Sequence, residues 1–306
     1  MKREAWKKEL KKKLSCSLEK DKDLASLSTL HVGGTGELFA EPSDLRDVSA
    51  LLRMRGEENF PLYILGGGSN VVFADGRLEG IVLSTRQLTN FKWEIQGTEG
   101  FLSTECGCPF SRVVSQAVKE GWTGAEFAVG IPGTVGGAVA GNAGVRGDSV
   151  GDLLEEVTTV EKDGNVRTWR RMEFDYAYRC FSLFSSDRLI AGCKMKFRKT
   201  SPGETEKKAE LFRRARANQP QGVRSAGCTF KNPAGQSAGR LLDVSGCKGL
   251  CVGDAVVSDV HANFIFNRVQ ATGTDIFKLM ESCRDIVLRK TGILLDPEIK
   301  LMGFGA

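Results

Sequence analysis

Apolar and polar residues follow helix-like patterns in some parts of the chain and strand-like patterns in others. Apolar residues recur at helical spacing over 43–55 and 109–120, and Gly121 follows the second segment as a helix stop. Runs bounded by turn residues predict strands at 38–40, 62–65, 71–73, 80–105, 156–162, 165–169 and 189–198. Asp163-Gly164 predicts a hairpin with a two-residue turn. Because strands and short helices mix without a repeating βαβ unit, the pattern favours an α+β fold over a doubly wound sheet.

The two ends of the chain carry patterns of their own. In the basic leader, Trp6, Leu10 and Leu14 recur four residues apart, which predicts a short amphipathic helix docked on the body of the protein. Turn residues at 200–203 predict a linker, so residues 200–306 are expected to form a separate domain. The elements predicted there are a charged helix at 204–217, a helix from Thr274 that ends before Gly292, and a strand at 298–302.

Composition excludes several classes of function. The formal net charge of +5 is accounted for by the first thirteen residues, with seven Lys or Arg and two Glu, and the balanced remainder argues against nucleic acid as a partner. The longest uncharged run, 127–145, is broken by proline and glycine, so no membrane span is expected. Nine scattered cysteines without a signal peptide indicate a reducing cytoplasm. With two histidines and no paired CxxC, no metal site is expected.

Two glycine-rich segments do not read as ordinary packed elements. GIPGTVGGAVAGNAG at 130–144 has six glycines, whose bare amides can form a nest for an anion, and tight packing without a ligand is the alternative. GGGSN at 66–70 follows a predicted strand and precedes another apolar run, which is a phosphate-loop context. Val71 stands where G-x-G-x-x-G requires glycine, and no G-x-x-x-x-G-K-[ST] occurs. For this second segment, a ligand turn and a structural turn are both open.

Three polar stretches could carry chemistry. Arg179 follows Tyr178 in the aromatic run YAYRCFSLF and is either a stacked surface residue or a fixed cation for a carboxylate. Cys228 lies in RSAGCTFKNPAGQSAGR, a loop rich in small residues, where a buried inert thiol is the commoner finding. Glu298 opens the last predicted strand, where a solvated carboxylate is the usual interpretation.

Seven motifs occur in order and at compatible spacing: STLHVGGTGELFAEPSD, ILGGGSNVVF, GIPGTVGGAVAGNAG, AYR, AGCTFKNPAGQSAGRLLD, HANFIFN and DPEIKLMG. Together they resemble the motif series of the UDP-N-acetylenolpyruvoylglucosamine reductase family over nearly the whole chain after the leader. The resemblance implies non-covalently bound FAD, NADPH as electron donor, and a UDP-sugar substrate, UDP-N-acetylglucosamine enolpyruvate, reduced to UDP-N-acetylmuramate for peptidoglycan synthesis.

The same resemblance implies a division of the chain. Residues 1–24 are the basic leader, and 25–199 form an FAD-binding unit of the vanillyl-alcohol-oxidase (PCMH) type, with subdomains at 25–90 and 91–199. Residues 200–306 form an α+β substrate-binding domain.

Individual residues also match family positions. Arg179 matches the family's active-site arginine, Cys228 its proton donor and Glu298 its active-site carboxylate. The implied substrate-lining positions are Tyr178, Asn232 and His261. For His261, a satisfied core histidine is the alternative. The implied FAD-binding positions are Gly66, Gly67, Gly68, Ser69, Asn70, Gly130, Ile131, Pro132, Gly133, Thr134, Gly137, Gly141 and Asn142.

The chain departs from the commoner family pattern in three places. Cys228 stands where many members have serine, and a thiol can still donate a proton. Ser182 lies three residues after Arg179, whereas the family more often has a serine two residues after its arginine, so Ser182 is given no role. Only 49 positions separate Arg179 from Cys228, which resembles the compact branch that lacks a substrate-covering tyrosine loop.

Two other functions stay open from the sequence. An FAD-linked oxidase of the same superfamily, acting on a sugar or alcohol, would need a catalytic base or a covalent flavin link, and neither His31 nor His261 lies in a glycine-rich segment. A non-catalytic flavin or nucleotide binder would not need Arg179, Cys228 and Glu298 together. The oligomeric state is also open, a monomer included.

Overall fold

The structure, a computed structural model, describes residues 2–145, 147–220 and 222–305. The chain divides into two compact units, each drawn from several stretches of sequence. Unit 1 comprises Met1–Glu19, Leu38–Gly67 and Gly80–Ala215, and unit 2 comprises Lys20–Glu37, Gly68–Glu79 and Arg216–Ala306. The boundaries inferred from sequence concern cofactor and substrate binding, and they stay a prediction. Within the described residues, no helix is both long and apolar enough to cross a membrane.

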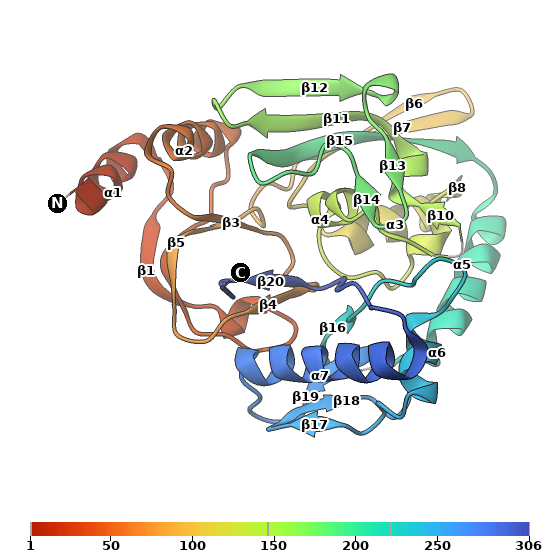
Figure 1. Cartoon of the computed structure of the whole chain (residues 1–306). Helices are drawn as coiled ribbons and strands as arrows, with labels where there is room; N and C mark the ends of the chain where they lie inside the picture. The colour runs from red at the N-terminus through yellow and green to blue at the C-terminus, as the bar shows by residue number, and fades with distance from the viewer. Residues whose placement is uncertain (1, 146, 221, 306) are drawn as a thin grey trace. The chain divides into compact units, whose positions relative to one another are not determined.

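A six-stranded antiparallel sheet dominates unit 1, with the order β12-β11-β15-β7-β6 and with β8 paired to β15 (Figure 1). Its strands are β6 (Phe91–Gln96), β7 (Glu99–Glu105), β8 (Trp122–Thr123), β11 (Leu154–Glu161), β12 (Val166–Arg170) and β15 (Arg188–Lys199). The long strand β15 joins two hairpins, because Gly192 lies opposite Glu105 of β7 and Thr158 of β11. Buried and partly exposed residues alternate along β7, as in a sheet with one core face.

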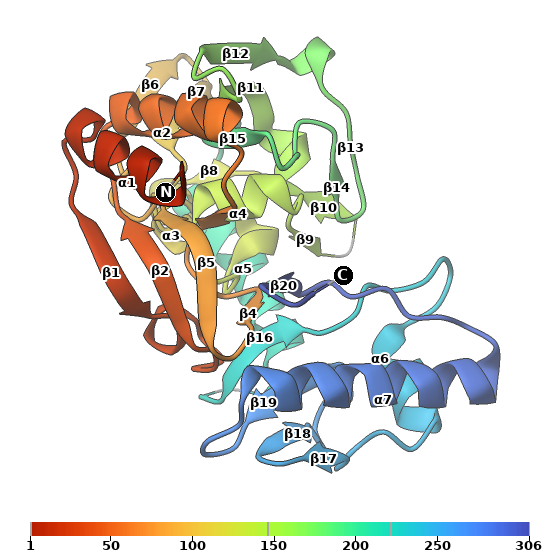
Figure 2. The ribbon, with the colours of Figure 1, turned by 60° about the vertical axis from the view of Figure 1, so that its left-hand side comes forward.

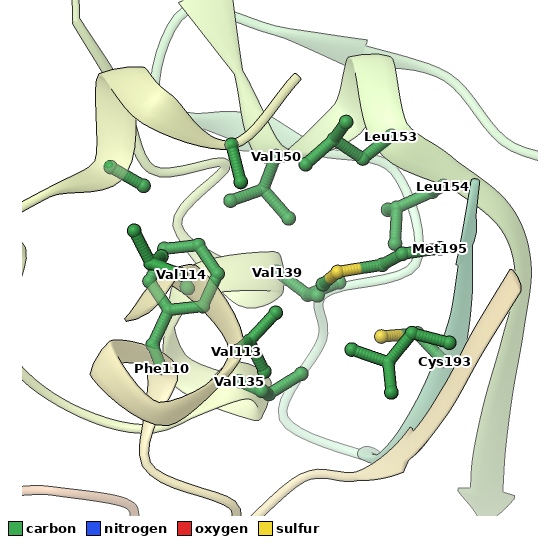
Figure 3. Packing of buried hydrophobic residues seen from close by; sticks show 14 of the residues in the cluster. Phe110, Val113, Val114, Val135, Val139, Val150, Leu153, Leu154, Cys193 and Met195 are labelled. Atoms are coloured by element: carbon green, nitrogen blue, oxygen red, sulfur yellow. The ribbon is translucent and has the colours of Figure 1, made fainter. Parts of the chain in front are cut away.

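Helices α3 (Phe110–Glu120) and α4 (Val135–Ala140) supply much of the main core of unit 1. Residues labelled in Figure 3 come from both helices and from the sheet: Phe110, Val113, Val114, Val135, Val139, Leu154 and Met195. Helix α3 matches the predicted segment 109–120. It ends at Gly121 with a φ of 73°, the left-handed conformation that a glycine helix stop provides.

Helix α1 (Lys2–Lys13) packs against α2 (Leu45–Glu58), and Figure 2 shows the two side by side. Trp6 stacks on Phe60 with 4.3 Å between ring centroids, and Leu10 and Leu14 are buried. The prediction of an amphipathic leader helix docked on the body of the protein is therefore confirmed.

Asp47 on α2 fastens the segment that follows α1. Its carboxylate accepts hydrogen bonds from the N–H and the hydroxyl of Ser15, at 2.9 and 2.8 Å, and from the N–H of Cys16 at 2.9 Å. Burial disfavours the charged form, but these hydrogen bonds outweigh it and hold the pKa of Asp47 below its ordinary value. The leader is thus held by a charged anchor as well as by its apolar face.

A four-stranded sheet has the order β1-β2-β5-β3. Its strands are β1 (Leu18–Asp23), β2 (Thr35–Ala40), β3 (Leu62–Leu65) and β5 (Arg77–Ser84). β3 coincides with the predicted strand at 62–65 and runs parallel to β5, with Leu65 opposite Ser84. Because β3 ends directly before GGGSN, this sheet positions the glycine turn.

The hairpin of β11 and β12 has a three-residue loop, so the predicted two-residue turn is wrong. Val160 pairs with Val166, and the Glu161 N–H donates to the Asn165 carbonyl, which leaves 162–164 as the loop. Gly164 has a φ of 79°, the left-handed residue that closes three-residue hairpin loops.

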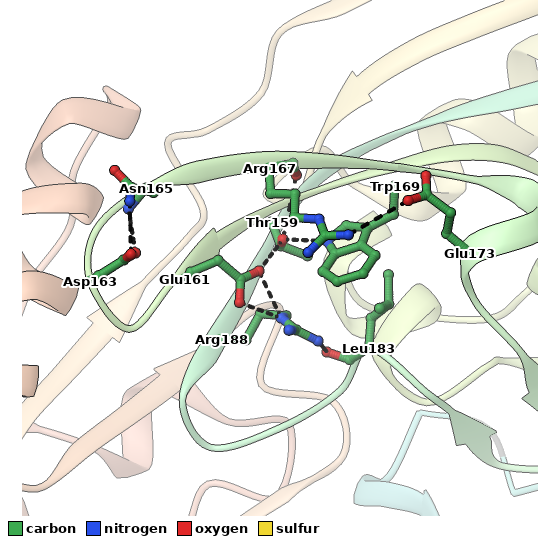
Figure 4. Close-up of polar contacts among 9 residues, drawn as sticks. All are labelled: Thr159, Glu161, Asp163, Asn165, Arg167, Trp169, Glu173, Leu183 and Arg188. Carbon is green, nitrogen blue, oxygen red and sulfur yellow. Dashed lines mark hydrogen bonds and ion pairs between the residues drawn. The ribbon is translucent and has the colours of Figure 1, made fainter.

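A polar cluster, drawn in Figure 4, covers one side of this hairpin. The Nε atom of Arg188 donates to the Glu161 carboxylate at 2.8 Å, and the indole N–H of Trp169 donates to the Thr159 hydroxyl at 2.8 Å. The guanidinium carbons of Arg167 and Arg188 lie 3.4 and 4.9 Å from the Trp169 ring centroid. Stacked cations and an ion pair therefore tie β15 to the hairpin.

Unit 2 contains a four-stranded antiparallel sheet of order β16-β19-β18-β17. The elements of unit 2 are η1 (Ala25–Leu27), β4 (Val71–Phe73), β16 (Arg224–Cys228), α6 (Ala238–Val244), β17 (Cys251–Val252), β18 (Ala255–Val257), β19 (Phe264–Asn267), α7 (Gly273–Thr291) and β20 (Lys300–Met302). Helix α7 lies along this sheet in Figures 1 and 2 and buries Ile276, Leu279 and Met280. It ends at Gly292 as predicted.

The last strand, β20, pairs in parallel with β4, with Leu301 opposite Val72. The run that follows GGGSN therefore lies beside the run that follows Glu298. This long-range pairing was not evident from the sequence.

Helix α5 (Pro202–Arg216) packs in unit 1. The Thr205 hydroxyl donates to the Val118 carbonyl at 2.7 Å, and Ala209 is buried in the main core. The sequence predicted a linker before this helix, at 200–203, whereas the boundary between the two compact units lies at its end. The remaining short elements of unit 1 are η2 (Glu126–Ala128), β9 (Gly144–Val145), β10 (Asp148–Ser149), η3 (Val150–Leu153), η4 (Arg171–Glu173), β13 (Tyr176–Ala177) and β14 (Cys180–Phe181).

Candidate active site

The two glycine-rich segments contact each other in unit 1. A Cβ atom on Gly66 would lie 2.5 Å from the Thr134 hydroxyl oxygen, and one on Gly67 would lie 2.6 Å from the Cα atom of Gly133. Neither glycine can therefore carry a side chain unless the facing segment moves. At these positions glycine serves close packing, which brings the turn at 66–67 against the start of α4.

Arg86, just beyond β5, holds the carbonyl groups of the same turn. Its Nε atom donates to the Gly66 carbonyl at 3.2 Å, and a terminal nitrogen donates to the Gly67 carbonyl at 3.1 Å. A planar guanidinium bonded to two consecutive carbonyls fixes both peptide planes. Arg86 could not be singled out from the sequence, because no local pattern indicates that a residue after a strand will reach back to a glycine turn.

The segment 130–144 presents main chain to solvent. Gly130 and Gly133 have φ values of 79° and 102°, and Gly130, Pro132 and Gly137 are exposed. The Thr134 hydroxyl caps α4 by accepting from the Gly137 N–H at 3.4 Å. The half-buried predicted members are Ile131, Gly133 and Gly141. Glycines at the surface let a diphosphate approach the main chain closely, so the residues present fit FAD.

The second half of GGGSN belongs to unit 2. Gly68 has a φ of 71°, and Ser69 is half-buried. The Asn70 side-chain amide donates to the Glu298 carbonyl at 3.2 Å, and the Asn70 carbonyl accepts from the Lys300 N–H at 3.0 Å. Asn70 thus holds the segment that carries the predicted active-site carboxylate. Glu298 lies two residues before β20 and not in that strand, where the sequence predicts it. The contact of Asn70 with a cofactor stays a prediction.

Arg179 lies in a turn in unit 1 and has a backbone conformation that few residue types adopt. β13 and β14 pair with Ala177 opposite Cys180, so Tyr178 and Arg179 form the turn, and Arg179 has a φ of 53°. The other described non-glycine residues with positive φ are Asp21, His31, Asn59 and Asn142, all of types that tolerate it. An arginine in this conformation marks a position where the surroundings fix the backbone, as functional sites often do.

The Arg179 side chain is directed along the glycine segment. A terminal nitrogen donates to the Gly144 carbonyl at 3.3 Å, and the guanidinium carbon lies 5.2 Å from the Tyr178 ring centroid. The structure therefore brings Arg179 and the end of 130–144 together, as the predicted site requires within this unit.

Cys228 ends strand β16 beyond a bulge. Ser225 pairs with Phe266 and Cys228 with Phe264, so the register shifts between them. Gly227 supplies the positive φ, 78°, within the bulge. Bulges re-aim the side chain that follows, and they are common next to active sites.

The segments that carry Cys228 and Glu298 lie side by side in unit 2. The Glu298 N–H donates to the carbonyl of Thr229 at 2.8 Å, and Phe230 forms a β-bridge with Pro297. Main-chain pairing of 229–230 with 297–298 thus brings together the segments that carry two of the predicted catalytic residues.

Asn263, which the sequence does not single out either, fixes this stretch. Its amide donates to the Phe230 carbonyl at 2.8 Å and accepts from the Phe230 N–H at 2.9 Å. The Nδ1 atom of His261 accepts from the Asn263 N–H at 3.3 Å, and a Cβ atom on Gly239 would lie 2.9 Å from the His261 ring. Burial lowers the pKa of His261, which favours a neutral ring. The HANF motif contains both residues, but it does not indicate their hydrogen bonds. The contact of His261 with the substrate stays a prediction.

Basic residues flank Glu298. Burial and the neighbouring Lys231 lower the pKa of Lys300, and the Glu298 carboxylate opposes this shift. Asn232 is exposed, and its side-chain oxygen accepts from the Ala238 N–H at 2.9 Å. Two ammonium groups beside a polar amide suit an anionic ligand. Across the described ranges of the chain, no cluster of His, Cys, Asp or Glu could hold a metal ion.

Comparison with known families identifies both parts of the chain. Residues 37–170 match the FAD binding domain family, and residues 219–302 match the C-terminal domain of UDP-N-acetylenolpyruvoylglucosamine reductase. The predicted combination of an FAD-binding unit and a C-terminal domain in an α+β fold is therefore confirmed.

Full-length relatives give the same result. UDP-N-acetylenolpyruvoylglucosamine reductase 2 of Symbiobacterium thermophilum is 38% identical over 277 residues, which cover 90% of this chain and 89% of that protein. The reductase of a Synechocystis species is 36% identical over 293 residues, 94% and 91% of the two chains. The crystal structure of the reductase from Thermus caldophilus matches with a TM-score of 0.79 and 31% identity, covering 94% of this chain and 99% of that one.

Proposed function

The chain belongs to the UDP-N-acetylenolpyruvoylglucosamine reductase family, and from this premise we propose how its residues carry out the family's reaction. It reduces UDP-N-acetylglucosamine enolpyruvate to UDP-N-acetylmuramate, a peptidoglycan precursor, with NADPH as reductant. FAD, when bound, supplies hydride transfer between NADPH and the enol-ether double bond. The observation that carries the assignment of residues is Arg179, held at a φ of 53° against the glycine segment.

We assign the two glycine-rich segments, 66–70 and 130–141, to the diphosphate and adenine side of FAD. Asn142, for which the sequence also implied a contact with FAD, instead bonds protein backbone with both ends of its side-chain amide. The exposed glycines Gly130 and Gly137 support this assignment, because a glycine at the surface lets a phosphate group approach the main chain closely. Arg86 keeps the Gly66 and Gly67 peptides in one orientation, so the turn is formed before the cofactor binds.

Arg179 is assigned to the substrate carboxylate. Hydride addition to the β-carbon of the enolpyruvyl group places negative charge on the α-carbon and its carboxylate. A planar guanidinium binds both carboxylate oxygens side by side, and these bonds strengthen as charge develops. Its anchoring at the Gly144 carbonyl limits the reorganisation needed during the reaction.

Cys228 is assigned the proton transfer that completes the reaction. The α-carbon must receive a proton, and a thiol is a stronger acid than the serine hydroxyl found in many members. The bulge at Gly227 directs this side chain, and the Thr229–Glu298 hydrogen bond keeps the two segments in register. Glu298, when protonated, would donate a hydrogen bond to the substrate carboxylate, and Tyr178, Asn232 and His261 would line the sugar nucleotide.

Two features of the cycle follow from the chemistry. NADPH would deliver hydride to FAD and the sugar nucleotide would receive it from FAD, so the two substrates would take turns in a ping-pong cycle. We place the reaction in the cytoplasm, because nine free cysteines suit a reducing compartment.

The reaction is tested by following the flavin absorbance without oxygen. NADPH should bleach the purified yellow protein, and addition of the enolpyruvyl sugar nucleotide should restore the oxidised spectrum while UDP-N-acetylmuramate forms. A reduced protein that the sugar nucleotide does not reoxidise would rule out the proposed function.

The role of Cys228 is tested with two matched variants. Cys228→Ala should be reduced by NADPH at the wild-type rate but form almost no product, whereas Cys228→Ser should retain turnover because a hydroxyl can still donate a proton. Unaltered turnover by Cys228→Ala would reject the role as proton donor.

A further inference from the structure

Asn142, two residues after the end of α4, joins two main-chain segments through its side chain. It is 3% exposed. Its amide nitrogen donates to the Ala177 carbonyl at 2.8 Å, and its amide oxygen accepts from the Gly151 N–H at 2.9 Å. Both ends of the amide are thus bonded to protein backbone, 35 and 9 residues away in the chain.

The Ala177 carbonyl is the point at which Asn142 reaches the Arg179 turn. Ala177 pairs with Cys180, and the strands on either side of the turn have only two residues each. A hairpin this short has few main-chain bonds of its own, so its turn needs support from outside. The bond from Arg179 to the Gly144 carbonyl leads to the same stretch, two residues beyond Asn142.

A separate contact supports the base of this hairpin. The Tyr176 hydroxyl donates to the Asp152 carboxylate at 2.9 Å, and Asp152 also accepts from the N–H and hydroxyl of Ser149. This contact fastens the hairpin one residue earlier and does not involve the Ala177 carbonyl. It therefore provides a matched control for a change at Asn142.

We propose that Asn142 is a positioning residue for Arg179, which sets the turn through the Ala177 carbonyl and so fixes the guanidinium relative to the glycine segment. This role differs from the FAD contact expected from the sequence. It rests on the proposed function, because it takes Arg179 as the group that binds the substrate carboxylate.

The test compares Asn142→Ala with Tyr176→Phe and wild type in the two half-reactions, each followed without oxygen. Asn142→Ala should be reduced by NADPH at the wild-type rate, because that step does not involve the substrate carboxylate. Its reoxidation by the enolpyruvyl sugar nucleotide should slow by about ten- to a hundredfold, since a misplacement of about 1 Å can cost about a hundredfold in rate. Tyr176→Phe should leave both rates unchanged.

Three outcomes would overturn the proposal. Reoxidation at the wild-type rate would show that Arg179 does not depend on Asn142. Equal slowing of both half-reactions, or loss of FAD affinity with reoxidation preserved, would show that Asn142 acts on the fold or the cofactor. Failure of the proposed function is distinguishable, because the wild-type protein itself would then not be reoxidised.

Hydrogen–deuterium exchange of the apoprotein gives a readout that needs no activity. In Asn142→Ala, the amides of 177–181 should exchange faster than in wild type, while those of α3 should be unchanged. Unchanged exchange at the turn would overturn the proposal, even if the loaded variant were too unstable to assay.

Discussion

Gly67 and Gly137 lie in the two glycine-rich segments, but alanine should change stability in opposite directions at the two positions. A Cβ atom on Gly67 would lie 2.6 Å from the backbone of Gly133, and overpacking of this kind costs about 1–3 kcal/mol. A Cβ atom on Gly137 would have the Thr134 hydroxyl oxygen as its nearest neighbour, at 3.7 Å, which is an ordinary contact. Gly137 lies inside α4, where alanine in place of glycine stabilises by about 0.5–1 kcal/mol.

Thermal unfolding of the two apoproteins measures these effects. With a shift of about 2–4 °C per kcal/mol, Gly67→Ala should lower Tm by about 2–12 °C and Gly137→Ala should raise it by about 1–4 °C. FAD titration adds a second readout. Gly137 is exposed, so a methyl group there should weaken FAD binding although the fold is more stable. A wild-type Tm for Gly67→Ala would refute the close approach of the two segments, and unchanged FAD affinity for Gly137→Ala would exclude that surface from the cofactor site.

Two further predictions concern single charged groups. Arg179→Lys should lose most of its reoxidation rate, about a hundredfold or more, because lysine keeps the charge but not the paired donors; steady-state turnover near wild type would contradict the bidentate contact. The folded-state pKa of Asp47 is depressed, so its contribution to stability is present above the unfolded pKa of about 3.9 and is lost as pH falls through the folded pKa. Asp47→Asn should therefore be less stable than wild type at pH 7 by about 1–3 kcal/mol, and it should lose less stability than wild type on acidification. Urea unfolding at pH 7 and at acid pH would measure both effects. An equal loss of stability on acidification in the variant and in wild type would contradict this reasoning.

The elements that the sequence predicted well are those specified by local pattern. Helix α3 has apolar residues on one face and Gly121 at its end, and the structure follows both signals. The hairpin at 162–164 shows the limit of such reasoning. Asp163-Gly164 predicts a turn, but the loop length depends on the pairing of Val160 with Val166, which the dipeptide does not determine.

The candidate site was predictable where motifs stand together in sequence and not where side chains bond to distant backbone. The motifs contained Arg179, Cys228 and Glu298, whereas the contacts that hold these segments come from elsewhere. Arg86 reaches a turn 19 residues earlier, and Asn263 holds a residue 33 positions away. No periodicity or turn signal records such side-chain to main-chain bonds, because each depends on the folded arrangement of two separate segments.

The parallel pairing of β4 with β20 has a consequence for how the polypeptide is made. Unit 1 ends at Ala215, so all of its residues are translated before 300–302. Residues 68–79, by contrast, contain β4, whose partner strand at 300–302 is translated much later. A nascent chain released before residue 300, or a deletion of 300–302, would leave β4 without its neighbour, so this loss should impair a segment made more than two hundred residues earlier.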